Sequence, residues 1–169
     1  MKKMHKGFTL VELLIVIGIM GILGAMGMIA GQEATSAARA TVIADNLEKL
    51  ATAAMMFYEE NSSEIDKTGQ VGGKNVTDEI LVDGINAYLK DANEISTYDD
   101  AEGNENEYFA TVYGTGATMT WWVGYYFGAS DGNAQIRKAM VNKVNRMGLK
   151  LAAAGADYAG GNVVYMKIR

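Results

Sequence analysis

A long uncharged segment near the start of the chain constrains its fold more than any other feature. Leu13 to Gln32 is a run of 20 residues without a charged side chain, mostly Leu, Ile, Val, Met, Ala and Gly. An apolar run of this length can cross a bilayer as a helix. It is preceded by Lys2, Lys3 and Lys6. Positive charge holds that end of a span in the cytoplasm, so the sequence predicts that the rest of the chain lies beyond the membrane.

A cleavable secretory signal is the alternative interpretation of this segment. Such a signal has a shorter apolar core and an A-x-A-like cleavage site, which the small residues of Ala25 to Ala30 match only weakly. The secretory interpretation also leaves Glu12 unexplained. An unpaired carboxylate at the border of an apolar span is costly, so Glu12 is predicted to be a functional residue.

The residues around Glu12 form a recognisable motif. Lys6 to Ile17, with the sequence KGFTLVELLIVI, resembles the prepilin-type leader and helix start of the type IV pilin and type II secretion pseudopilin superfamily. In that family a membrane peptidase cuts after the glycine and methylates the new N-terminal residue. The resemblance therefore implies cleavage after Gly7 and methylation of Phe8. It also implies that the ammonium of Phe8 in one subunit neutralises Glu12 of a neighbour during assembly.

The same resemblance implies a location and a set of partners. The precursor is expected in the bacterial cytoplasmic (inner) membrane, and the processed chain in an extracellular filament on the cell surface. The implied partners are further copies of the chain, the prepilin peptidase and the inner-membrane assembly machinery. The expected function is a filament subunit for adhesion, motility or surface attachment. The alternatives are a pseudopilin of a type II secretion or DNA-uptake system, and a non-polymerising sensor or membrane-tethered enzyme with a single span.

Composition narrows the chemistry that the chain can perform. It has no cysteine and a single histidine, His5, so thiolate metal sites, cysteine nucleophiles and a Ser-His-Asp triad are excluded. The formal net charge of -5 argues against a generic nucleic-acid binder. We therefore expect no enzyme, no catalytic residues, no cofactor and no specific nucleic-acid partner.

Helical periodicity continues beyond the apolar segment. Apolar residues recur at alternating spacings of three and four at Ala40, Ile43, Leu47, Leu50, Ala54 and Phe57. The pattern predicts one helix from Phe8 to about Glu60, roughly 80 Å long at 1.5 Å per residue. Residues 8–32 would be its transmembrane and assembly half, and residues 33–60 its soluble half. A separate soluble helix after a membrane linker is the alternative, but no proline interrupts the pattern.

Glycines recur within the apolar half of this helix. They are Gly18, Gly21, Gly24, Gly27 and Gly31. In a water-exposed helix each would cost about 1 kcal/mol relative to alanine. Two explanations stay open: close helix packing through small residues, and local unwinding of the helix on assembly. Many pilins have a proline in this segment, which this chain lacks.

Residues 61–169 are predicted to form a globular α+β head. Asn61 to Asn75 has the composition of a surface loop, and Asp78 to Lys90 that of a short helix capped by Thr77. Strands rich in β-branched and aromatic residues are expected at Glu107 to Tyr113, Thr118 to Phe127 and Asn162 to Arg169. A second helix is expected over Asn133 to Ala154. The whole would be a pilin-like ladle, with the long helix packed on an antiparallel sheet with short helices.

Aromatic side chains are concentrated in the second predicted strand. They are Trp121, Trp122, Tyr125, Tyr126 and Phe127. Successive residues of a strand point to opposite faces, so about half of these should lie in the core. The others would face solvent, where they are available for adhesion.

Two charged groups in the head are candidates for contacts or metal binding. Acidic residues gather at Asp99, Asp100, Glu102, Glu105 and Glu107. Carboxylates are ligands that calcium prefers, and major pseudopilins bind calcium in a loop of the head. The spacing here is not that of an EF-hand. A solvated acidic loop is the other interpretation. Lys143, Arg146 and Lys150 would share one helical face. This basic face is either solvated, or in contact with the acidic loop of the same or an adjacent head, in place of the disulfide of many pilins.

Overall fold

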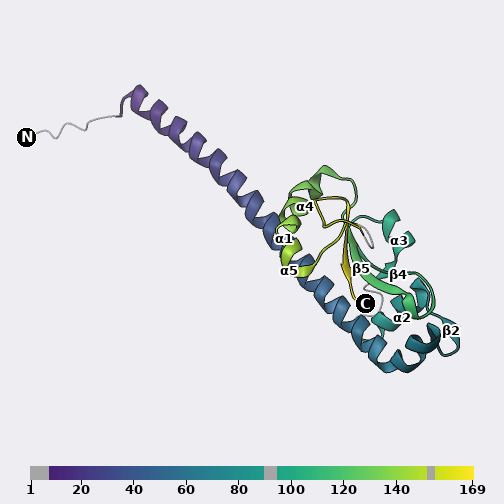
Figure 1. The fold of residues 1–169 in the computed structure, drawn as a ribbon. Coiled ribbons are helices and arrows are strands. Elements are labelled where there is room, and N and C mark those ends of the chain that lie inside the picture. Colours follow the sequence, from purple (N-terminus) through teal and green to yellow (C-terminus); the bar gives the residue numbers. More distant parts are fainter. Residues whose placement is uncertain (1–7, 90–94, 152–154) are drawn as a thin grey trace, which may run out of the picture. The chain divides into compact units, whose positions relative to one another are not determined.

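The structure is a computed structural model that describes residues 8–89, 95–151 and 155–169 (Figure 1). The chain divides into two compact units, residues 1–36 and 37–169, and each is described separately. The first unit contains the N-terminal part of helix α1 (Leu10–Thr68). The second contains the remainder of α1 and all the other helices and strands. The predicted leader, residues 1–7, lies outside the described residues.

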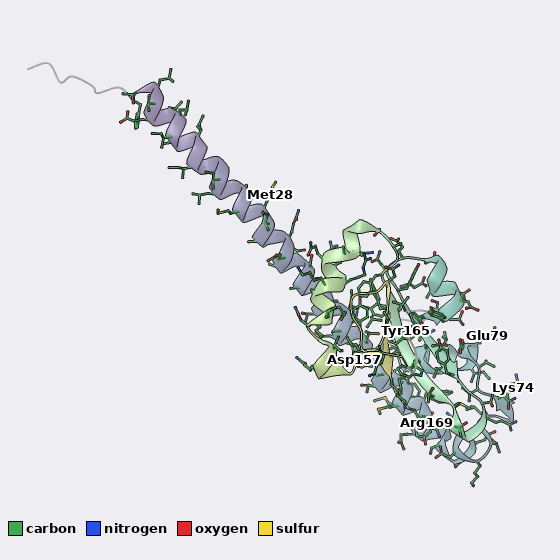
Figure 2. All side chains as sticks on the ribbon, turned by 45° about the horizontal axis from the view of Figure 1, so that its top comes forward. Met28, Lys74, Glu79, Asp157, Tyr165 and Arg169 are labelled. Atoms are coloured by element: carbon green, nitrogen blue, oxygen red, sulfur yellow. The ribbon has the colours of Figure 1, made fainter. Side chains whose placement is uncertain are left out.

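The first unit exposes its apolar side chains. Every large apolar side chain between Leu10 and Ile29 is at least 46% exposed, the value for Val16. Figure 2 shows these side chains projecting from the ribbon around Met28. A contiguous apolar surface of this extent is typical of a segment that contacts a membrane or another protein.

In the second unit, α1 buries one face. Its buried residues are Ala40, Ile43, Ala44, Leu47, Leu50, Ala53, Ala54, Phe57 and Ile65. The predicted apolar stripe is thereby confirmed, but the loop interpretation of Asn61 to Asn75 is wrong because α1 continues to Thr68. Ile65 is fully buried, and this burial outweighs the weak helix propensity of the polar residues before it. The helix ends at Gly69, which has a left-handed φ of 71°.

Four strands form the main sheet, in the order β3-β4-β5-β6. The antiparallel strands are β4 (Glu107–Tyr113), β5 (Thr120–Tyr126) and β6 (Val163–Lys167), close to the predicted bounds. β3 (Ser96–Thr97) was not predicted and pairs in parallel with β4, so the sheet is mixed. A strand of two residues carries too little periodicity to be read from sequence. The predicted α+β class, a long helix packed on a sheet with short helices, is confirmed.

One face of the sheet packs on the second-unit part of α1. Trp121, Val123, Tyr125 and Phe127 of β5 and the loop after it share one hydrophobic core with that helix. The rings of Phe57 on α1 and Trp121 on β5 are stacked, with 5.8 Å between their centroids. The alternate residues of β5 therefore face α1, as the strand periodicity predicts.

The opposite face of the sheet is also covered, which the sequence analysis did not anticipate. Ala101 of helix α3 (Tyr98–Gly103) packs there with Phe109, Trp122 and Tyr165. Trp122 is only 3% exposed. The expectation that about half of the β5 aromatics face solvent is therefore wrong, because α3 forms a second layer over residues that would otherwise be outside.

The remaining elements are short. Helix α2 (Asp78–Asn86) begins at Thr77, whose hydroxyl accepts a hydrogen bond from the Ile80 amide. A hairpin of β1 (Gln70–Val71) and β2 (Lys74–Asn75) connects α1 to α2. The 3₁₀ turns are η1 (Gly116–Thr118) and η2 (Asp131–Asn133). Helix α2 ends at Asn86, before the predicted end at Lys90, and the predicted ends at Lys90 and Ala154 both lie outside the described residues.

The predicted helix over Asn133 to Ala154 is wrong as a single element. It is two helices, α4 (Ala134–Val141) and α5 (Val144–Met147). Gly148, with a left-handed φ of 64°, ends α5. Lys150 then leaves the helical path, because its backbone exchanges hydrogen bonds with Tyr165 at the edge of the sheet.

Candidate functional site

The first turn of α1 is held by a reciprocal pair of hydrogen bonds. The Thr9 amide donates to Glu12 Oε2 at 2.8 Å, and the Glu12 amide donates to Thr9 Oγ1 at 3.2 Å. The Thr9 hydroxyl donates a further bond to Glu12 Oε2 at 2.8 Å. The first amides of a helix have no partner inside the helix, and this capping box satisfies two of them.

This arrangement gives Glu12 a partner within its own chain. A carboxylate at the N-terminus of a helix is also favoured by the helix dipole. The family resemblance implies only a contact between subunits for Glu12, and the cap was not predicted. The signal was readable, because a threonine followed three residues later by a glutamate, ahead of an apolar run, is the signature of a capping box.

Both bonds to the Glu12 carboxylate use the same oxygen. Oε2 accepts from the amide and the hydroxyl of Thr9, whereas Oε1 has no hydrogen-bond partner among the described residues. Phe8, the residue before the cap, is 85% exposed. Gly7 lies outside the described residues. The site therefore combines an accessible residue at the expected cleavage position with a carboxylate oxygen that is open to a further donor.

Within the described residues of the first unit, every glycine lies inside α1, which is helical through each of them. A Cβ placed on Gly18, Gly21, Gly24 or Gly27 would meet no atom within 4 Å, and the same holds for Gly31. Packing within the chain therefore does not require glycine at these positions. Close packing between copies and local unwinding on assembly both stay predictions.

α1 is the one helix of the described chain that is long and apolar enough to cross a membrane, judged by length and composition. A family model described as the prokaryotic N-terminal methylation motif matches residues 2–28. The predicted resemblance is thereby confirmed: the chain carries the prepilin signature of type IV pilins and pseudopilins. No curated protein and no solved structure matches the chain. The signature and the apolar helix together fit a membrane-anchored precursor that a prepilin peptidase processes.

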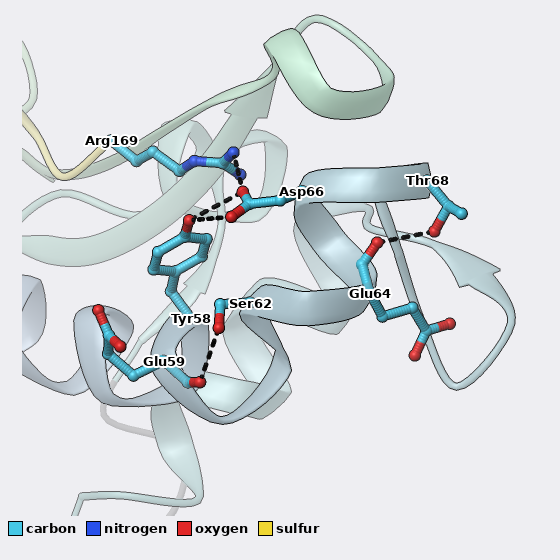
Figure 3. A network of polar contacts seen from close by, with 7 residues as sticks. All are labelled: Tyr58, Glu59, Ser62, Glu64, Asp66, Thr68 and Arg169. Carbon is cyan, nitrogen blue, oxygen red and sulfur yellow. Dashed lines mark hydrogen bonds and ion pairs between the residues drawn. The ribbon is translucent and has the colours of Figure 1, made fainter.

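A second polar site joins the C-terminal end of α1 to the sheet (Figure 3). Arg169 Nη2 lies 2.6 Å from Asp66 Oδ1, and the Tyr58 hydroxyl donates to the same carboxylate at 2.8 Å. The guanidinium of Arg169 also lies over the ring of Tyr58, 4.6 Å from its centroid. The hydrogen bond to Asp66 raises the pKa of Tyr58 above its ordinary value. The three side chains act as one contact between the two layers of the head.

The acidic residues proposed for calcium do not form the predicted loop. Asp99 and Asp100 lie in the first turn of α3, where acidic side chains are favoured by the helix dipole. Asp100 Oδ2 accepts a hydrogen bond from the Thr97 hydroxyl at 2.7 Å. The side chain of Glu102 lies outside the described part of the structure. Within that part, no group of three His, Cys, Asp or Glu residues is arranged to hold a metal ion.

The basic face predicted from Lys143, Arg146 and Lys150 does not form as one helical surface. Lys143 occupies the residue before α5 without a side-chain capping bond and Arg146 lies within the helix, but Lys150 is beyond it. Lys150 Nζ instead pairs with Asp157 at 2.6 Å. The prediction failed because Gly148 ends the helix before the third residue of the face. A contact between Lys143 or Arg146 and the acidic residues of an adjacent head stays a prediction.

Proposed function

We propose that this chain is the structural subunit of an extracellular type IV pilus-like filament. The observation that carries the proposal is the prepilin signature at residues 2–28, which includes the start of a helix whose apolar side chains are exposed. Cleavage after Gly7 would keep this helix in the mature subunit. The helix would anchor the precursor in the membrane and then pack against the helices of other copies. Such a filament serves adhesion, motility or surface attachment, and the chain's role is structural and not enzymatic.

Glu12 has two tasks in this proposal. Within the subunit it completes the helix cap through Oε2. Between subunits, Oε1 would accept the methylated ammonium of Phe8 from a neighbour. An ion pair in apolar surroundings is stable only when both charges are paired and hydrogen-bonded, so the contact would select the register in which Phe8 meets Glu12.

Electron microscopy of sheared surface material tests the proposal. The proposed function predicts fibres that contain this chain, beginning at Phe8, and their loss when the gene is deleted. A pseudopilin of a secretion or DNA-uptake system would carry the same signature. It would give few surface fibres, and its deletion would instead abolish secretion or DNA uptake.

A further inference from the structure

Two segments of the chain match the acceptor motif for N-linked glycans, Asn-x-Ser/Thr with x other than proline. They are Asn61-Ser62-Ser63 and Asn75-Val76-Thr77. A sequence match alone does not distinguish an acceptor from a coincidence, because the asparagine and the hydroxyl residue must reach the transferase together. In the structure the two segments differ in backbone conformation and in the direction of their motif side chains.

The second segment is extended and turns both motif side chains to solvent. Asn75 and Thr77 are exposed, whereas Val76 between them is buried at 7% exposure. Residues two apart in an extended chain point to the same side, which places the carboxamide and the hydroxyl together on the outer surface. Thr77 has the extended values φ −113° and ψ 172°. Figure 2 shows the preceding residue, Lys74, at the periphery of the head.

The surroundings of Asn75 leave its reacting atom accessible. Its Oδ1 accepts a hydrogen bond from Gln70 Nε2 at 3.2 Å, while Nδ2 has no partner among the described residues. The adjacent turn is open, since a Cβ on Gly72 or Gly73 would meet no atom within 4 Å. Val76 is buried in the core, and its amide donates to the Gly69 carbonyl at 3.1 Å. These two contacts fix the backbone of the motif.

The first segment lacks these properties. Asn61 lies inside α1 and its Nδ2 already donates to the Phe57 carbonyl at 2.9 Å. Residues two apart in an α-helix are rotated by about 200°, so Asn61 and Ser63 point to opposite sides. Modification of Asn61 would require unwinding of the helix next to the buried Ile65. Asn61 is therefore an internal control for Asn75.

We propose that Asn75 is the acceptor of an N-linked glycan on the exported head, an inference that rests on the export of the head in the proposed function. The donor is an oligosaccharide carried on polyprenyl pyrophosphate at the membrane. Nδ2 attacks the anomeric carbon, a C–N bond forms, and the bond between that carbon and the phosphate oxygen breaks. Polyprenyl pyrophosphate leaves with the electron pair, and the carboxamide loses one proton to the transferase.

The experiment measures the intact mass of the processed full-length subunit from its native cells. The expected mass exceeds that of the methylated polypeptide by at least one monosaccharide, and peptide mapping places the excess on Asn75. Asn75→Gln and Thr77→Asp should both remove it. Thr77→Asp is the sharper variant, because aspartate still caps α2 and only the motif is lost. Thr77→Ser keeps motif and cap and should keep the glycan, and Asn61→Gln should change nothing.

Two results would overturn the inference. One is a native subunit whose mass the methylated polypeptide fully explains. The other is an excess that persists in Asn75→Gln or disappears in Asn61→Gln. Microscopy of the same preparations separates this inference from the proposed function, since fibres built of unmodified subunit refute the glycan and leave the filament standing.

Discussion

The guanidinium of Arg169 lies 2.6 Å from the carboxylate of Asp66, and this ion pair ties the residues after β6 to the last turns of α1 (Figure 3). The two residues are 103 positions apart in sequence. The chain contains no cysteine, so a noncovalent contact of this kind, and not a disulfide, joins these two parts of the described head.

Arg169→Ala should lower the free energy of unfolding of the head by about 1 kcal/mol. The ion pair between Arg169 and Asp66 is partly exposed and contributes little alone, but the substitution also removes the cation from the face of Tyr58. Urea unfolding of the chain from Ala37 onward measures the effect. A double-mutant cycle with Tyr58→Leu, which removes the ring beneath the guanidinium, should show coupling between the two residues. Fully additive effects would contradict a joint contact.

Gly124→Ala should destabilise the head by about 1 to 3 kcal/mol through overpacking. Gly124 of β5 lies opposite Phe109 on one side and Tyr165 on the other, and the two rings meet edge to face with centroids 5.4 Å apart. A Cβ at this position would overlap the ring of Phe109. Phe109→Leu in the same chain should relieve part of the loss. Gly72→Ala is not a suitable control, because Gly72 has a positive φ.

Stability of the head should fall as the pH rises from about 10 toward 12. Burial raises the pKa of Tyr125 to about 12, and burial also raises the pKa values of Tyr158 and Tyr165. Within this pH range the folded state keeps protons that the unfolded chain has lost, so the free energy of unfolding decreases. At pH values below the pKa of tyrosine in the unfolded chain, both states keep these protons, so the free energy of unfolding is not reduced. Tyr125→Phe should flatten the decline in urea midpoints.

The sequence predicted those features that depend on neighbouring residues. The prepilin motif and the apolar stripe of α1 are each readable from local spacing, and so are strands β4, β5 and β6. The burial of Trp122 could not be predicted, because Ala101 is distant from it in sequence and packs with it only in the folded chain. The same holds for the last turns of α1, which Ile65 stabilises by burial. The Thr9 and Glu12 cap was local and was missed, since the family role of Glu12 already explained the carboxylate.

The cap and the charge of Glu12 can be separated by substitution. Glu12→Gln keeps the side-chain acceptor that a capping box uses but removes the charge, so we expect processed subunit in the membrane with few fibres. Thr9→Ala removes the cap, at a cost of about 1 kcal/mol to the helix, and keeps the charge, so fibres should still form. Electron microscopy and immunoblots of membrane fractions provide both readouts. Abundant fibres in Glu12→Gln would contradict the ion pair with Phe8.

The most direct test is the mass of the N-terminal peptide of this chain in sheared extracellular fibres. The proposed function predicts that the peptide begins at Phe8 and carries one added methyl group, with the three lysines of the leader removed. A peptide that begins at Met1, or within Ala25 to Ala30, would contradict it, and so would the absence of the chain from all extracellular material.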